Sequence, residues 1–193
     1  MKDAQPARRK RKPIDEAWAS VAAQNGGSVR ERRGVVKSFD VPYRGWTLTV
    51  ERYSADGSTT WTRVRTRFAT RMPLRLTIAR DTPFHRLGRA LGMQDIVAGN
   101  PAFDRAFNVR ADCESMVRSL LLNRAITDRM LKDRAARLEL RPVRGGQRGA
   151  ARAELRFYAR PAKDTATLEA ILDLVHTVLD GLERVGVARN END

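Results

Sequence analysis

Apolar and polar side chains alternate with a period of two along seven short segments of the chain. In the clearest segment, Trp46, Leu48 and Val50 alternate with threonine and glutamate. Successive side chains of a strand point to opposite faces of a sheet, so this pattern predicts half-buried strands. Turn signals such as Asp56-Gly57 between them favour antiparallel hairpins. The predicted strands cover residues 35–41, 46–53, 59–68, 74–79, 106–110, 137–141 and 152–157.

Apolar side chains that recur every three to four residues predict five helices. The longest begins after Asp164, an expected N-cap, and continues for about five turns. Its apolar stripe consists of Leu168, Ile171, Leu172, Val175, Val178, Leu179, Leu182 and Val185. The shorter helices are predicted over 13–24, 83–91, 113–122 and 124–133. The expected N-caps of the last three are Thr82, Asp112 and Asn123, respectively.

The first of these helices has acidic residues in its first turn. Asp15 and Glu16 follow Pro13, which suits the first helical position. Their charges complement the positive end of the helix dipole.

Runs of strands joined by short turns predict an α+β fold. We expect an antiparallel sheet of about five to seven strands, in which the first four strands form a meander with one face exposed to solvent. A long C-terminal helix and two or three shorter helices should pack on the sheet, and a helix-grip-like arrangement is one candidate. Residues 13–193 are predicted to form a single domain, preceded by a disordered basic arm over residues 1–12.

The composition is that of a basic, soluble globular protein. The 193 residues are 41% hydrophobic and 31% charged, and the net charge is +14. Residues 1–13 contain six basic side chains and one acidic side chain, so the rest of the chain keeps a charge of +9. Of the 37 basic residues 31 are arginine, a skew that is also typical of GC-rich genomes. A single cysteine and the lack of a long apolar run predict a reducing cytoplasm and no membrane span.

Several motifs between residues 43 and 185 occur in a recognisable order. They are Tyr43-x-x-Trp46, Thr62-Arg63, Gly92-x-Gln94-Asp95-Ile96 and Asn100-Pro101-x-Phe103-Asp104-x-x-Phe107-x-Val109, followed by Leu120-Leu121-Leu122. With these motifs the chain resembles a group of bacterial domains of uncharacterised function, in which an Asp-Ile segment and an FD-x-x-F-x-V segment precede a leucine-rich helix. The resemblance implies a bacterial source and an α+β fold, and it implies no activity or catalytic residue.

The central stretch 91–122 contains the least generic residues, but their spacing matches no known catalytic or metal-binding pattern. Asp95, Asp104 and Asp112, with His85 nearby, are the conceivable metal ligands. The favoured interpretation is that Asp95 and Asp104 hydrogen-bond loop backbone amides and that Asp112 caps a helix. Residues 99–101 are predicted to form a loop.

The other reactive residue types also have a structural interpretation. We expect His176 to be packed or partly exposed beside the apolar stripe, and Cys113 to be inert. The sequence lacks a serine nucleophile elbow and a phosphate-binding glycine loop. No cofactor, metal or catalytic residue is predicted.

The most distinctive chemistry is an arginine stripe between residues 57 and 80, which has six arginines and no acidic residue after Asp56. Arg63, Arg65 and Arg67 share one face of a strand with Trp61. This face would suit single-stranded nucleic acid or an acidic partner protein. Alternatively, it is a solvated face on which the arginines pair with Glu51, Glu139 or Glu154. The basic arm would contact nucleic acid or anionic lipid, act as a nuclear signal, or only increase solubility. The candidate contacts are Arg8, Arg9, Lys10, Arg11, Lys12, Trp61, Arg63, Arg65, Arg67 and Arg75.

These observations favour a non-enzymatic interaction or accessory domain of a bacterial cytoplasmic protein with an unknown protein partner. The first alternative is a nucleic-acid-binding protein that uses the basic arm and the arginine-rich face. The second is a small-ligand-binding protein or enzyme with a pocket between the long helix and the sheet.

Overall fold

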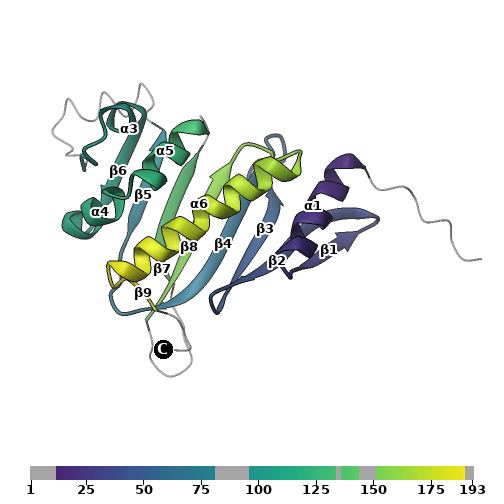
Figure 1. Ribbon diagram of the computed structural model, residues 1–193, viewed down its shortest axis with the longest axis horizontal. Helices are drawn as coiled ribbons and strands as arrows, with labels where there is room; N and C mark the ends of the chain where they lie inside the picture. The colour runs from purple at the N-terminus through teal and green to yellow at the C-terminus, as the bar shows by residue number, and fades with distance from the viewer. Residues whose placement is uncertain (1–11, 81–95, 134–135, 144–150, 190–193) are drawn as a thin grey trace, which may run out of the picture.

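In the computed structural model, residues 12–80, 96–133, 136–143 and 151–189 are described, and they form one antiparallel sheet with helices on one of its faces (Figure 1). The strands are β1 (Ser28–Arg32), β2 (Val35–Tyr43), β3 (Trp46–Tyr53), β4 (Trp61–Thr70), β5 (Leu76–Arg80), β6 (Phe107–Ala111), β7 (Arg137–Val143), β8 (Arg152–Ala159) and β9 (Ala188–Arg189). The helices are α1 (Pro13–Gln24), α3 (Pro101–Ala106), α4 (Glu114–Leu121), α5 (Arg124–Lys132) and α6 (Thr165–Arg184). The predicted α+β class is confirmed.

The sheet is larger than the sequence pattern indicated. It has nine strands in the order β1-β2-β3-β4-β8-β7-β5-β6, and β9 pairs with β4. The seven predicted strands are all present, and β1 and β9 are additional. The predicted four-strand meander is wrong at its last step, because β5 pairs with β6 and β7 rather than with β4. The β7–β8 hairpin is inserted between β4 and β5.

One row of side chains across the sheet forms the centre of the core. The register places Phe39, Val50, Val64, Phe157, Leu138, Ile78 and Val109 side by side on seven successive strands. All seven side chains are fully buried. The period-two alternation therefore identified the buried face of these strands correctly.

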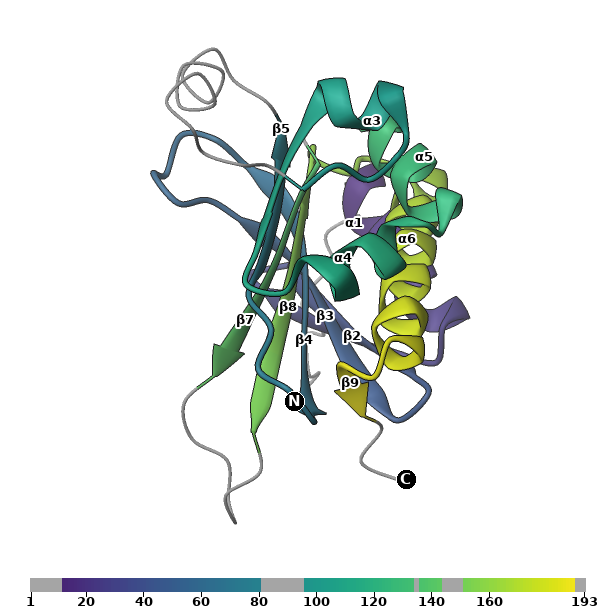
Figure 2. The same cartoon turned by 90° about the vertical axis from the view of Figure 1, so that its left-hand side faces the viewer.

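All described helices lie on this apolar face, and the opposite face has no helical cover in the described ranges (Figure 2). In Figure 1, α1 lies over β1 and β2, α6 crosses the middle of the sheet, and α3, α4 and α5 lie toward the β6 edge. The predicted stripe of α6 is buried from Leu168 to Leu182, and Val185 is partly buried. The long helix thus covers the central strands.

The capping predictions are confirmed at two helices. Asn123 accepts a hydrogen bond from the backbone of Ala125 at the start of α5, and Asp164 accepts one from Thr167 in α6. At α4 the N-cap is Cys113, and the Asp112 carboxylate accepts instead from the backbone N–H of Arg75 at 2.9 Å. Asp112 therefore joins the segments before β5 and after β6, and its prediction as a cap is wrong.

Residues 99–101, predicted as a loop, include the start of helix α3. Asn100 is its N-cap and accepts from the backbone of Ala102 and Phe103, with Pro101 at the first position. The helix predicted over 83–91, with Thr82 as its cap, lies outside the described residues.

Helix α1 is attached to the sheet through its buried side chains. Trp18 is fully buried and its indole Nε1 donates to the carbonyl of Ala162, 3.1 Å away. Asp15 is also buried, and its carboxylate accepts from Arg52 at 2.8 Å and from the backbone of Val36 at 3.1 Å. Asp15 lies in the first turn of α1 as predicted, and it is also the acidic half of a buried ion pair.

Leu172→Ala in α6 is expected to lower the free energy of unfolding by about 2–5 kcal/mol, because the truncation leaves a cavity against the sheet. Glu169→Ala, on the exposed side of the same helix, should change it by less than about 0.5 kcal/mol. Urea denaturation monitored by circular dichroism measures both. Equal losses in the two variants would contradict the buried position of the stripe.

Candidate anion-binding face of the sheet

The face of the sheet opposite the helices is a polar surface dominated by arginine. Strand register places eleven arginines on it, against four carboxylates, which leaves seven positive charges. The arginines are Arg30, Arg32, Arg63, Arg65, Arg67, Arg110, Arg137, Arg141, Arg152, Arg156 and Arg189, and the carboxylates are Asp40, Glu51, Glu139 and Glu154. We refer to this set of residues as the arginine face.

Three glutamates of the arginine face are each shared by two arginines. Glu51 accepts from Nε of Arg63 and of Arg65, both at 2.9 Å. The other two groups have the same composition. They are Glu154 with Arg67 and Arg156, and Glu139 with Arg137 and Arg141. Each group therefore retains one net positive charge.

In two of these groups the glutamate is far less exposed than its arginines. The side chains of Glu139 and Glu154 are only 4% and 5% exposed. Burial alone would raise the pKa of Glu154, but hydrogen bonds from Arg156 and Arg67 outweigh it and hold that pKa below its usual value. The glutamate stays ionised and fixes the orientation of its arginines.

Two of the arginines bind their glutamate through Nε, and their terminal Nη groups do not take part in that hydrogen bond. Arg65 and Arg67 each bond to glutamate through Nε, at 2.9 and 3.1 Å. Within the described residues, the terminal Nη groups of these two side chains have no hydrogen-bond partner. A guanidinium fixed at Nε presents its Nη pair to a carboxylate or a phosphate in the bidentate geometry that arginine prefers.

Aromatic side chains lie at one end of the arginine face. Tyr53 and Tyr158 pack edge to face with ring centroids 5.8 Å apart, and the guanidinium of Arg63 lies 3.7 Å from the centre of the Tyr53 ring. Trp61, opposite Tyr53 in the register, is half-buried. Much of this aromatic surface is thus used within the protein.

The structure brings together only part of the predicted contact set. Arg63, Arg65, Arg67 and Trp61 share the arginine face, and the predicted partners Glu51 and Glu154 lie beside them. The pairing proposed for a solvated face is therefore present at both glutamates, while Glu139 pairs with Arg137 and Arg141 of its own strand.

The remaining predicted contacts lie elsewhere. Arg75 is exposed one residue before β5, and Lys12 is the exposed N-cap of α1. Arg80, part of the same sequence stripe, lies over the Phe107 ring at 5.3 Å. Arg8, Arg9, Lys10 and Arg11 lie outside the described residues.

Sequence reasoning missed the contribution of β7 and β8 to this surface. The alternation of arginine and glutamate in both strands was visible, with Arg137, Glu139 and Arg141 in one and Arg152, Glu154 and Arg156 in the other. Placing them beside Arg65 required the knowledge that β8 pairs with β4.

The central aspartates have structural roles where they are described. Asp104 accepts from the backbone of Ala98 at 2.8 Å and of Gly99 at 3.1 Å, which is the loop bracing that was predicted. Asp95 and His85 lie outside the described residues. Within the described ranges, no group of three or more histidine, cysteine, aspartate or glutamate residues is placed to hold a metal ion.

His176 belongs to a contact between α6 and the β2–β3 turn. Its ring stacks on Tyr43 with centroids 3.7 Å apart, and the Tyr43 hydroxyl donates to Asp180 at 2.9 Å. Burial and the Asp180 hydrogen bond raise the pKa of Tyr43 to about 12, and burial lowers the pKa of His176. Cys113 is half-buried and packs against the core, and its sulfur lies 3.6 Å from the Ser115 hydroxyl. The packed histidine was predicted.

Among the helices of the described ranges, none combines the length and apolar character that a membrane crossing requires. Comparisons of the chain with protein-family models, with curated proteins and with solved structures gave no match. The resemblance of residues 43–185 to a group of bacterial domains therefore stays a prediction.

Proposed function

We propose that this protein is a non-enzymatic interaction module that uses the arginine face to dock on an acidic surface of a partner protein. The observation that carries the proposal is the set of three glutamates, each shared by two arginines, on a face without helical cover in the described ranges. The glutamates hold the guanidinium groups in place before any partner binds. Such preorganisation lowers the entropic cost of association.

The composition of the face supports a protein partner. Arginine, tyrosine and tryptophan are enriched at protein interfaces and at their energetic hot spots, whereas lysine is depleted. The cations placed on the face by strand register are all arginine, with Tyr53, Tyr158 and Trp61 at one end. The buried glutamates alternate with the arginines at fixed positions. A partner surface with the complementary pattern of charges would therefore bind in one alignment.

Single-stranded nucleic acid is the second candidate, and the aromatic end of the face is the observation that favours it. Arg63 lies against Tyr53 of the neighbouring strand, and Trp61 is two residues before Arg63 on β4, so a base could stack beside a guanidinium. The basic arm would then add phosphate contacts.

The test removes one arginine from each glutamate group. Arg65, Arg67 and Arg141 have side chains that are 36%, 56% and 52% exposed, and each glutamate keeps its other arginine when they are changed. We expect Arg65→Gln/Arg67→Gln/Arg141→Gln to weaken binding of a labelled oligoglutamate peptide by about tenfold or more at low salt. Fluorescence anisotropy at two salt concentrations measures the affinity.

The matched control removes three positive charges from the helical side. Arg105→Gln/Arg118→Gln/Arg124→Gln has the same net charge as the test variant, and it should bind oligoglutamate within about twofold of the wild type. Equal losses in the two triple variants would mean that only net charge matters and would overturn the proposal. A loss confined to a variant lacking residues 1–12 would do the same.

An oligothymidylate probe separates the two candidates. If nucleic acid is the partner, the wild type binds it more tightly than oligoglutamate of equal charge, and Trp61→Ala costs a further 1–3 kcal/mol or so. If a protein is the partner, Trp61→Ala affects both probes alike.

A further inference from the structure

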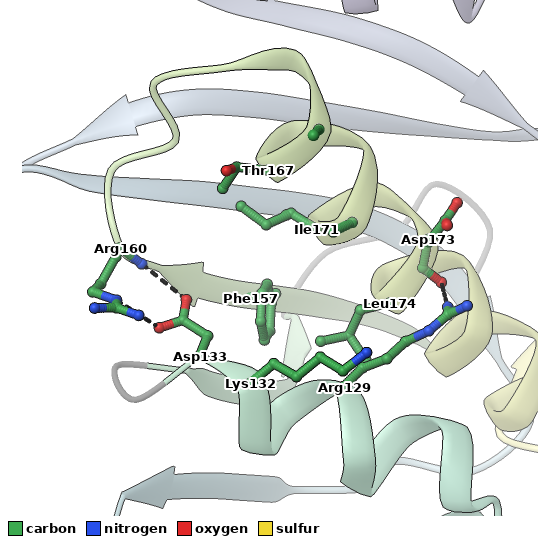
Figure 3. A pocket seen from close by; sticks show the side chains of 11 residues that line it. Arg129, Lys132, Asp133, Phe157, Arg160, Thr167, Ile171, Asp173 and Leu174 are labelled. Carbon is green, nitrogen blue, oxygen red and sulfur yellow. Dashed lines mark hydrogen bonds and ion pairs between the residues drawn. The ribbon is translucent and has the colours of Figure 1, made fainter.

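A cleft of about 620 Å³ lies on the other side of the sheet, between α5, α6 and the end of β8 (Figure 3). This volume is within the range typical of small-molecule sites. Its apolar floor is formed by Phe157, Ile171 and Leu174, which are at most 7% exposed. Three basic residues, Arg129, Lys132 and Arg160, and two acidic residues, Asp133 and Asp173, also line it. A cleft between the long helix and the sheet was one alternative considered from the sequence.

The charges at the cleft are not all compensated. Arg160 pairs with Asp133, with Nε 3.3 Å from the carboxylate. Arg129 instead donates to two neutral acceptors on α6, the carbonyl of Asp173 and the hydroxyl of Thr177, both at 2.9 Å. Among the described residues Arg129 forms no ion pair, and Lys132 has neither an ion pair nor a hydrogen bond.

These two cations share one side of α5 because they are three residues apart. Figure 3 shows both side chains extending from α5 toward α6. Arg129 is held in place by its bonds to α6, so its positive charge is fixed at the cleft. The nearby C-terminal end of α5 favours cations, which explains why the helix tolerates the pair.

We propose that the cleft is a binding site for a small amphipathic anion, in which Arg129 and Lys132 contact a carboxylate, phosphate or sulfonate group and the floor of Phe157, Ile171 and Leu174 contacts an apolar body. Charged groups beside a largely apolar floor are the usual composition of such sites. The cleft shares no residue with the arginine face, so this site and the proposed docking function stand independently.

A pair of fluorescent probes isolates the role of the charge. Anilinonaphthalene sulfonate has a sulfonate on an aromatic body, and N-phenyl-1-naphthylamine is the same body without it. We expect the wild type to bind one anilinonaphthalene sulfonate per chain. Arg129→Gln/Lys132→Gln should weaken the sulfonate by about tenfold or more and leave the neutral probe within about twofold.

Two further variants locate the binding. Ala170 lines the cleft from α6, and its exposed position makes Ala170→Trp compatible with the fold. This variant should abolish binding of both probes. Arg105→Gln/Arg124→Gln removes two positive charges from α3 and α5 outside the cleft and should leave both affinities unchanged. Thermal unfolding shows that each variant remains folded.

Competition identifies the anionic group. Octanoate and octyl phosphate should each displace the sulfonate probe, and the tighter competitor indicates a carboxylate or a phosphate ligand. Inorganic phosphate lacks an apolar body and should not compete. Sulfonate binding that persists in Ala170→Trp, or is unaffected by Arg129→Gln/Lys132→Gln, would overturn the proposal. Several probes bound per chain would do the same, because that result is typical of nonspecific apolar surface.

Discussion

Asp15→Ala is expected to lower the free energy of unfolding by about 3–5 kcal/mol, the range for removing one member of a buried ion pair. The Asp15 side chain is 1% exposed and Arg52 is 19% exposed. Without the carboxylate, Arg52 would keep its charge next to the Trp18 ring, 4.9 Å away, without a counter-ion. The backbone N–H of Val36 would also lose its acceptor. Urea denaturation gives the difference.

Glu16→Ala is the matched control, because Glu16 is also in the first turn of α1 but is exposed. If both acidic residues acted through the helix dipole alone, both substitutions would cost about 0.3–1 kcal/mol. Asp15→Asn keeps an acceptor for Val36 and removes the charge, so its loss isolates the ion pair. An Asp15→Ala loss no greater than that of Glu16→Ala would contradict the buried pair.

Local patterns predicted most elements because each is determined by a few neighbouring residues. The bounds of α1 and β3 agree with the expected ranges, and the α6 stripe is buried as predicted. Such agreement follows from the periods of two and three to four residues, which depend only on which face is buried. Asn100 had the same capping chemistry as Asn123, and its short helix was missed because residues 101–106 show no extended period.

The turn that follows β1 explains why the sequence pattern did not predict this strand. Arg33 and Gly34 connect β1 to β2 with φ values of 54° and 76°, both in the left-handed region. Asparagine or aspartate usually occupies the first of these positions. With arginine there, the sequence lacks the Asn-Gly or Asp-Gly pair by which such a hairpin is predicted. The exposed side chains of β1 also give little apolar alternation.

Strand order depends on contacts that no local pattern records. After β4 the chain passes the positions of β8 and β7 before it pairs again, a distance of about three strand spacings, or about 14 Å. A five-residue connection can span this distance, and a hairpin from much later in the sequence fills the gap. The arginine face was therefore predicted only in part, since Arg137, Arg141, Arg152 and Arg156 reach it through that hairpin.

The inserted strand β8 contributes to both candidate sites, because its side chains alternate between the two faces of the sheet. Phe157 belongs to the core row and the floor of the cleft, and its neighbours Arg156 and Tyr158 belong to the opposite face. Phe157→Ala is expected to lower the free energy of unfolding by about 3–5 kcal/mol, because a side chain that is 1% exposed is replaced by a cavity at the centre of the sheet.

Tyr158→Ala provides the comparison on the same strand. Tyr158 is half-buried and packs edge to face on Tyr53, so its loss should cost about 1 kcal/mol. Equilibrium unfolding in urea, monitored by circular dichroism, measures both variants. The opposite ranking would place the core on the Tyr158 side of β8 and contradict the assignment of the two faces. The expected ranking would support the assignment of Phe157 to the helix-covered face and of Tyr158 to the arginine face.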